Sequence, residues 1–159
     1  MALTGELITH SSYGMPVIFR ACGYFHETNN TRVAYTSVGP DRVVSAFTVP
    51  ATAKSGSAIG VSDTTENQDG GGAGASQTRF YLSTNTLLDA ADILLGSRVV
   101  PELAPAASSA AATSLTLPAG IAPRLYYILA KADADEAGGE VNEASGTRVA
   151  AVTVSSPAP

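Results

Sequence analysis

The stretch Thr78-Arg79-Phe80-Tyr81-Leu82-Ser83 carries the pattern that decides the fold. Phe80 and Leu82 fall on one face of an extended chain and Arg79 and Tyr81 on the other, because successive side chains of a β-strand point to opposite sides. Comparable stretches recur at the spacing of a β-sandwich, bounded by Gly, Pro, Asn or Asp, and no stretch has a convincing helical period. We therefore expect seven strands, at residues 42–49, 57–66, 78–83, 93–100, 113–117, 125–131 and 147–154.

The composition of this 159-residue chain agrees with an all-β fold. Ala, Gly, Ser and Thr make up close to half of the residues, aromatic residues only 6%, and Trp is absent. Such small residues favour a thin β-sandwich, since a helical bundle would contain more Leu, Glu and Lys. The net charge of −5 argues against a nucleic-acid-binding protein that works through a basic face.

A long internal repeat indicates how the chain is divided. Residues 27–38 align with residues 143–154, and six of the twelve aligned residues are identical, including the run Thr-Arg-Val-Ala. The offset of 116 residues is close to the length of an immunoglobulin-like domain, which favours a tandem array of such domains. The alternative is a chance likeness between two β-strands.

The repeat predicts four segments: a leader of unclear origin (1–26), the last strand of a truncated preceding repeat with a linker (27–40), a complete sandwich module (41–155) and a tail (156–159). Segment 31–38 would then be a strand without its own sheet, and unpaired strand edges favour pairing. We expect this segment to pair with residues 17–21, with an edge of the module, or with another chain. Pairing with another copy of this chain would be self-association.

Five stretches of this sequence match motifs of a known protein family, namely Gly39-Pro40-Asp41, Thr78–Asn85, Leu88–Gly96, Leu115–Pro118 and Leu125–Ala130. With these motifs the module resembles the CARDB family, the cell-adhesion-related domain found in bacteria. The likeness covers about three quarters of the chain. The resemblance implies an all-β, immunoglobulin-like Greek-key β-sandwich of about seven strands, of a kind usually found in tandem on exported proteins.

The resemblance and the repeat together imply a non-catalytic module of a cell-surface or secreted protein. It would act as a spacer, as an adhesion contact or as a protein-interaction domain, with another protein or a surface glycan as its partner. The alternative is an accessory domain of an exported hydrolase that binds carbohydrate or another substrate. The sequence has no basic start followed by an apolar core, so we expect no signal peptide and no membrane insertion of this chain.

The positions of the histidines and the cysteine argue against an enzyme. His10, Cys22 and His26 all precede the predicted module, which therefore lacks the commonest general base and a thiol nucleophile. These three residues also lack a recognised zinc-binding spacing. We expect no catalysis and no cofactor other than weakly bound calcium.

Two acidic stretches contain the candidate calcium ligands, which are Asn85, Asp89, Asp92, Asp133 and Asp135. The second stretch begins like an EF-hand loop, but alanines occupy later ligand positions of that pattern, so it is not one. For the first stretch the alternative is turn capping, in which Asn and Asp side chains accept hydrogen bonds from their own backbone.

Arg79 and Tyr81 are the candidate ligand-binding residues. They share the strand face opposite to Phe80 and Leu82, and one of the adjacent Tyr126 and Tyr127 is expected to lie on the same outer face. An exposed aromatic patch of this kind is able to bind a sugar or a protein. The alternative is that the tyrosines are ordinary surface residues, since single exposed aromatic side chains are common.

Overall fold

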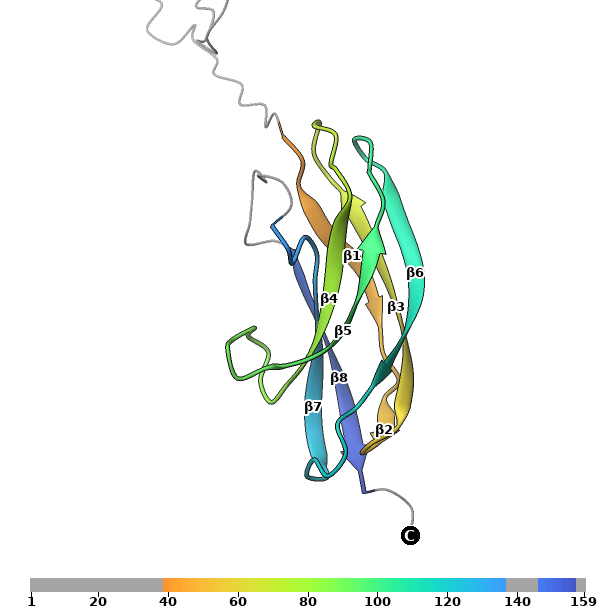
Figure 1. Ribbon diagram of the computed structural model, residues 1–159, viewed down its shortest axis with the longest axis vertical. Coiled ribbons are helices and arrows are strands. Elements are labelled where there is room, and N and C mark those ends of the chain that lie inside the picture. Colours follow the sequence, from red (N-terminus) through yellow and green to blue (C-terminus); the bar gives the residue numbers. More distant parts are fainter. Residues whose placement is uncertain (1–38, 137–145, 157–159) are drawn as a thin grey trace, which may run out of the picture. The chain divides into compact units, whose positions relative to one another are not determined.

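Two layers of β-strands make up the part of the chain that the computed structural model describes, residues 39–136 and 146–156 (Figure 1). The strands are β1 (Arg42–Thr48), β2 (Thr52–Lys54), β3 (Ala58–Asn67), β4 (Ser76–Ser83), β5 (Ile93–Val100), β6 (Ser108–Thr116), β7 (Arg124–Lys131) and β8 (Thr147–Ser155). The described residues include no helix, and hence none able to cross a membrane. The all-β prediction is therefore confirmed.

The strands form one sheet of three strands and one of five. The first has the order β1-β3-β6 and the second the order β2-β8-β7-β4-β5. Neighbours are antiparallel except for β2 and β8, which are parallel. The chain crosses repeatedly between the sheets, as it does in immunoglobulin-like sandwiches.

The predicted number of seven strands was wrong, because a short additional strand, β2, follows the strand predicted at 42–49. Pro50 follows β1 and has no N–H to donate to a ladder. After it the chain crosses to the other sheet, where Thr52, Ala53 and Lys54 pair with the end of β8. The structure therefore has eight strands. A second difference is that β6 begins at Ser108, five residues before the strand predicted at 113–117.

The hydrophobic core lies between the sheets and follows the alternation of each strand. Phe80 and Leu82 of β4 point inward, as predicted, and Phe80 is completely buried. They pack in one cluster with inward-facing residues of both sheets, among them Val44, Val61, Leu115, Ile128 and Val152. Burying an aliphatic or aromatic side chain of this size contributes about 1.5–3 kcal/mol.

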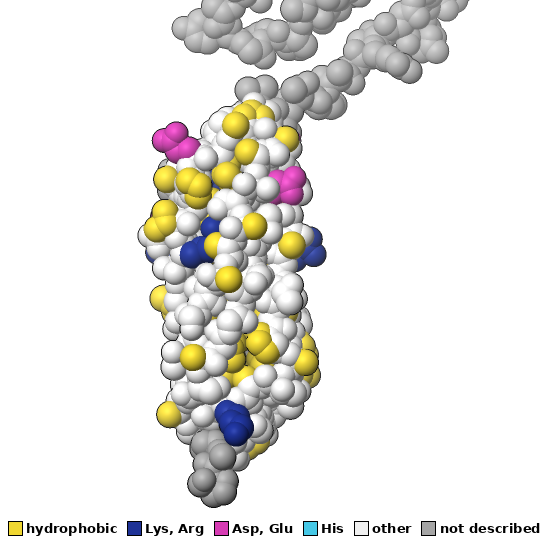
Figure 2. All heavy atoms as spheres, turned by 90° about the vertical axis from the view of Figure 1, so that its right-hand side faces the viewer, with side chains coloured by type: hydrophobic (Ala, Val, Ile, Leu, Met, Phe, Trp, Pro, Cys, Tyr) yellow, Lys and Arg dark blue, Asp and Glu magenta, His cyan; other side chains and the backbone are white. Residues whose placement is uncertain are grey.

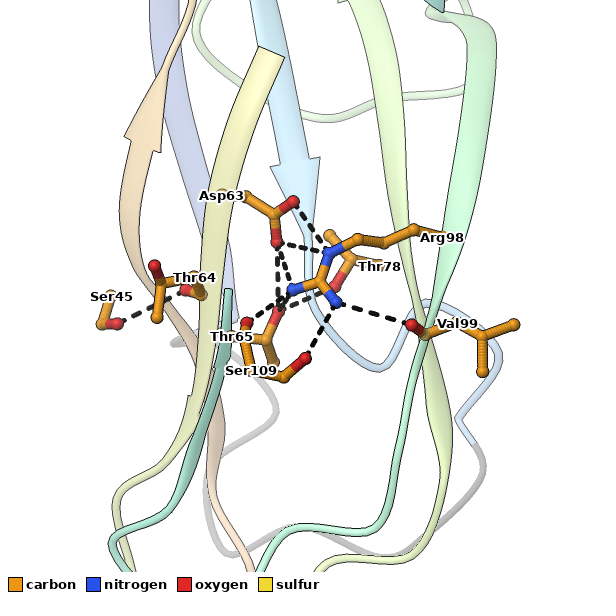
Figure 3. A network of polar contacts seen from close by, with 8 residues as sticks. All are labelled: Ser45, Asp63, Thr64, Thr65, Thr78, Arg98, Val99 and Ser109. Carbon is orange, nitrogen blue, oxygen red and sulfur yellow. Dashed lines mark hydrogen bonds and ion pairs between the residues drawn. The ribbon is translucent and has the colours of Figure 1, made fainter. Parts of the chain in front are cut away.

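A buried arginine joins the sheets on the β5–β6 side of the sandwich (Figure 3). Arg98 of β5 binds Asp63 of β3, with Nη2–Oδ2 at 2.6 Å and Nε–Oδ1 at 2.8 Å, and it also donates to the Ser109 carbonyl at 2.8 Å. Thr65 and Thr78 continue the network through a 2.8 Å hydrogen bond between their hydroxyls. The two charged side chains are only 8% and 0% exposed, so each depends on the other for compensation of its charge.

A second arginine joins the sheets on the β1–β8 side. Arg148 of β8 donates from Nε to the Val44 carbonyl at 2.8 Å and from Nη2 to the Ser45 carbonyl at 2.9 Å. These carbonyls belong to β1, where the register with β3 shifts between Val44 and Ala46. The β-bulge at this point leaves carbonyls unpaired in the ladder, and the guanidinium of Arg148 satisfies two of them.

Candidate functional site

The β4–β5 turn gathers three of the predicted ligand residues, and their oxygens accept hydrogen bonds from the turn itself. Asn85 Oδ1 accepts from the Leu87 N–H at 2.7 Å, and Asp89 Oδ1 accepts from the Ala91 N–H at 2.7 Å. Asp92 Oδ2 accepts from the Asp89 N–H at 2.9 Å. These are the local side-chain to backbone bonds that cap turns. One oxygen of each side chain is therefore already used.

A hollow of about 270 Å³ lies beside this turn. The turn forms one wall, and the start of β7 forms another, where the guanidinium of Arg124 lies 4.9 Å above the ring centroid of Tyr126. Ile93 and Ile121 complete the lining. Because Arg124 covers the face of Tyr126, this ring is not free to stack against a sugar. The hollow offers carboxylates, one guanidinium and apolar carbons to a small polar group.

The other two predicted calcium ligands lie at the opposite end of β4. Asp133 Oδ2 accepts from Arg42 Nη1 at 2.9 Å, and both side chains are buried. Asp135 Oδ1 accepts from the backbone N–H of Gln77 at 3.1 Å. The five residues are thus not brought together. Within residues 39–136 and 146–156, no three His, Cys, Asp or Glu side chains lie close enough to hold a metal ion, and calcium binding stays a prediction.

The outer face of the five-stranded sheet carries the predicted ligand-binding residues Arg79 and Tyr81. Tyr81 pairs with Leu94 on one side and with Leu129 on the other, and Leu129 pairs with Val149. We call these four side chains the outer ladder. Leu129 is fully buried although it faces away from the core, whereas Leu94 is 56% exposed. The ladder is therefore an apolar stripe across four strands.

Basic side chains border the outer ladder. Arg79 pairs directly with Lys131 on the neighbouring strand, and Arg79 Nη1 donates to the Ala134 carbonyl at 3.0 Å. Tyr127, rather than the buried Tyr126, belongs to this face, where it pairs with Ser83 and Ala151. This face therefore combines apolar, aromatic and cationic groups.

The three-stranded sheet has a different outer surface. A shallow hollow of about 370 Å³ on it is lined mainly by small side chains, among them Ala46, Thr48, Ser62, Thr64 and Ala110. Figure 2 shows the β6 side of the module, on which charged side chains are few and most of the surface is backbone or uncharged polar side chains. The large exposed hydrophobic residues of the described chain all lie on the other sheet or its β4–β5 turn.

Sequence reasoning missed the buried charged residues. Asp63 follows Ile59 and Val61 at the core-facing positions of β3, and an acid in that register indicates a buried partner. That signal was present in the alternation of the strand. Its partner Arg98 gave no comparable signal, and neither did the exposed Arg148, because their bonds join strands that are distant in the sequence.

The described residues thus form an immunoglobulin-like sandwich with a polar turn and an apolar outer face. The sequence model of the CARDB family matches residues 39–149. The chain belongs to the CARDB family of cell-adhesion-related, non-catalytic domains. No curated protein matches the chain.

Solved structures with the same fold come from several organisms. The CARDB domain of a Pyrococcus furiosus protein, determined in complex with di-metal ions, is 20% identical over 76% of this chain and 97% of that chain, with a TM-score of 0.58. A domain of a putative cell surface protein from Methanosarcina acetivorans is 20% identical over 73% and 92%, with a TM-score of 0.54. A β-glucosidase from Listeria innocua matches over 74% of this chain but only 16% of its own, at 16% identity and a TM-score of 0.51.

Proposed function

We propose that this protein contributes a non-catalytic spacer module to a cell-surface or secreted protein and holds the domains on either side of it apart. The observation that carries the proposal is that the chain begins the module at one end of the sandwich and leaves it at the other (Figure 1). A module of this kind adds length to a chain of domains without an active site of its own.

The strand pairing supports this placement of the two ends. Arg42, at the start of β1, pairs with Asn67 at the end of β3, and the Arg42 carbonyl lies near Gly146, just before β8. At the other end of the module, Ser155 pairs with Lys54. Strand β8 runs the whole way between these ends, and its nine residues span roughly 27 Å at about 3.3 Å per residue.

The first residues of the module are fastened to its loops, which favours a spacer of defined length. The Gly71 N–H donates to the Gly39 carbonyl at 3.0 Å, and the Gln68 N–H donates to the Asp41 carbonyl at 2.8 Å. The Asp41 N–H donates to Oδ1 of Asn67, a completely buried side chain, at 3.1 Å. Three hydrogen bonds over three residues leave little freedom at this junction.

Small-angle X-ray scattering tests the spacer function. One copy of residues 39–156 is compared with two copies joined in series, the second copy following directly on the end of the first. We expect the maximum dimension to increase by the length of one module. Two copies packed side by side, with an increase well below one module length, would contradict the proposal. Two copies joined by a long Gly/Ser linker serve as the flexible control, because such linkers behave as random coils.

The outer ladder supports adhesion as an additional task of the module, with a protein or a surface glycan as the partner. The alternative, an accessory domain of an exported hydrolase, uses the same face to bind carbohydrate. Purified chain is tested against a glycan array and against extracts of surface protein, with Tyr81→Ala as the variant and Thr116→Ala, on the other sheet, as the control. Binding of a surface protein that Tyr81→Ala alone abolishes would favour adhesion, whereas glycan binding that Tyr81→Ala alone abolishes would agree both with adhesion to a surface glycan and with the hydrolase accessory role. Absence of binding in both assays would support the spacer function alone.

A further inference from the structure

We propose that the module resists tension applied along its long axis, and that the contact of β8 with the β1–β2 segment is the part that resists it. This inference rests on the proposed spacer function, because a spacer between a cell and an attached surface is pulled at its two ends. It adds a mechanical property that a spacer does not need in order to hold domains apart.

The topology sets the direction in which each strand is pulled. Tension enters at the start of β1 and leaves at the end of β8, which lie at opposite ends of the sandwich (Figure 1). Strands β2 and β8 are parallel, so pulling the chain before β2 one way and the chain after β8 the other way slides the two strands along each other. Hydrogen bonds between strands lie across the strand direction. They therefore share the tension and must break together rather than one after another.

Backbone hydrogen bonds connect residues 51–55 of the β1–β2 segment to the end of β8. The Thr153 N–H donates to the Ala51 carbonyl at 2.9 Å, and the Ser55 N–H donates to the Ser155 carbonyl at 2.9 Å. Between them lies the register of β2 with β8, and the Ser155 hydroxyl adds a bond to the Ala53 carbonyl at 3.3 Å. These bonds join the segment at which tension enters directly to the strand at which it leaves.

Arg148 adds a charged connection nearer the start of β8. Its two bonds to the Val44 and Ser45 carbonyls join β8 to β1, which belongs to the other sheet. Hydrogen bonds from a charged donor are about twice as strong as neutral ones. Sliding β8 toward its own end pulls the guanidinium away from both carbonyls at once, so this side chain opposes the motion that tension favours.

The core opposes the same sliding. Val152 and Val154 of β8 are buried in the hydrophobic core cluster with 0% and 1% exposure. Because side chains alternate along a strand, a shift of β8 toward its own end by one residue would turn both valines to the outer face and bring the smaller Ala151 and the polar Thr153 inward. No intermediate register is favourable, and the strand must leave its place in a single step.

Single-molecule force spectroscopy on the full chain tests the inference by comparing two pulling directions in a Cys22→Ser background. In the first, handles are attached at Met1 and Pro159. In the second, handles are attached at Pro159 and at an Ala122→Cys thiol, an exposed position at the start of β7 that lies at the same end as the end of β8. The second direction peels β8 from β7 one bond at a time. We expect the most frequent unfolding force to be at least about twofold higher in the first direction at equal pulling speed.

A matched pair of arginine variants locates the resistance. Arg148→Met removes the bonds between β8 and β1, whereas Arg98→Met removes the buried pair between β5 and β3, neither of which is a terminal strand. We expect Arg148→Met to lower the end-to-end unfolding force more than Arg98→Met does. In denaturant the order should reverse, because Arg98→Met leaves Asp63 buried without its cation. If either variant fails to fold, the comparison of the two pulling directions on the parent chain remains decisive.

The outcomes separate this inference from the spacer function. Equal forces in the two pulling directions, or a larger loss of force in Arg98→Met than in Arg148→Met, would overturn the inference. Neither result would change the scattering from two copies in series. Conversely, side-by-side packing in the scattering experiment would refute the spacer function and leave the force comparison on a single chain valid.

Discussion

Arg98 and Arg148 join the two layers of the sandwich near their edges. The chain has one cysteine, so no disulfide within it can do so. Arg98 donates hydrogen bonds to a carboxylate and a carbonyl of the three-stranded sheet, and Arg148 donates to two carbonyls of β1. The planar guanidinium suits both tasks, because its donors point in several directions from one rigid group. Such a side chain specifies which strands face each other.

Replacing one member of the Arg98–Asp63 pair should lower the free energy of unfolding far more than replacing both members. Arg98→Met leaves the Asp63 carboxylate buried without a cation, and we expect it to lower the free energy of unfolding by about 3–5 kcal/mol. The double variant Arg98→Met with Asp63→Leu leaves no buried charge, so it should lose markedly less. Urea unfolding followed by circular dichroism measures both. A double variant as unstable as the single one would contradict this explanation of the pair.

The carboxylate of Asp89 should stabilise the β4–β5 turn without any metal ion. Asp89→Ala removes the 2.7 Å bond from the Ala91 N–H, and we expect a loss of about 1 kcal/mol in the free energy of unfolding. The loss should be the same in excess calcium and in chelator. Glu102→Ala, an exposed acid on another loop, is the control and should change little. A melting temperature of the parent chain that rises with calcium would instead demonstrate a metal site.

Among the elements, the loop between β3 and β4 is what fastens the start of the module. Gly71 lies so close to the linker that an added Cβ would come within 2.5 Å of the Gly39 carbonyl carbon. The three nearest atoms are all backbone atoms of Gly39 and Pro40, so no flexible side chain is there to move aside. The glycine run 70–72 and 74, which sequence alone suggests to be a flexible loop, therefore includes one glycine that the contact with the linker requires.

Gly71→Ala should separate the linker from this loop. We expect loss of the bond from the Gly71 N–H to the Gly39 carbonyl, faster amide exchange at Asp41 and Gln68, and a destabilisation of about 1–3 kcal/mol. Gly72→Ala is the matched control, because nothing lies within 4 Å of its added Cβ. Equal exchange rates in the two variants would show that the contact does not order the linker. Hydrogen exchange measured by NMR resolves the individual amides.

How well each element was predicted depends on whether its signal was local. The strand at residues 93–100 has the predicted bounds, because its apolar run ends at a proline. The three-residue β2 is too short to show alternation, and it exists because β8 offers a partner. The start of β6 is a run of Ser and Ala with no apolar pattern. It is extended because it pairs residue by residue with β3.

The candidate site shows the same limit. The polar turn at residues 85–92 could be predicted, since Asn and Asp are turn-forming residues and their bonds are local. Its neighbours in the hollow, Arg124 and Tyr126, could not, because pairing of β4 with β7 brings them there. Likewise the four side chains of the outer ladder come from four strands. They line up as one stripe only because of the register in which these strands pair.

At the scale of the whole molecule, the structure shows what some of the identical repeat residues do in the second copy, where all but Glu143 lie within the described residues. In the second copy of the repeat, Arg148 binds β1, and Val154 fills the core. Their counterparts in the first copy, Arg32 and Val38, lie outside the described residues, as do the predicted leader at 1–26 and the predicted pairing of segment 31–38. The division into modules therefore stays a prediction that truncation is able to test.

Removing residues 1–38 should leave the stability of the module unchanged. The core cluster and both arginine contacts are made entirely by residues from Arg42 onward, and the linker bonds begin at Gly39. A chain that starts at Gly39 should therefore unfold in urea with the same midpoint and slope as the full chain. A chain that starts at Val43 lacks Arg42 and leaves Asp133 buried without that cation, so it should lose several kcal/mol, about 3–5 by analogy with other halved buried pairs. A lower midpoint on removal of residues 1–38 alone would show that the preceding segment packs on the module, and the boundary at residue 41 would then be wrong.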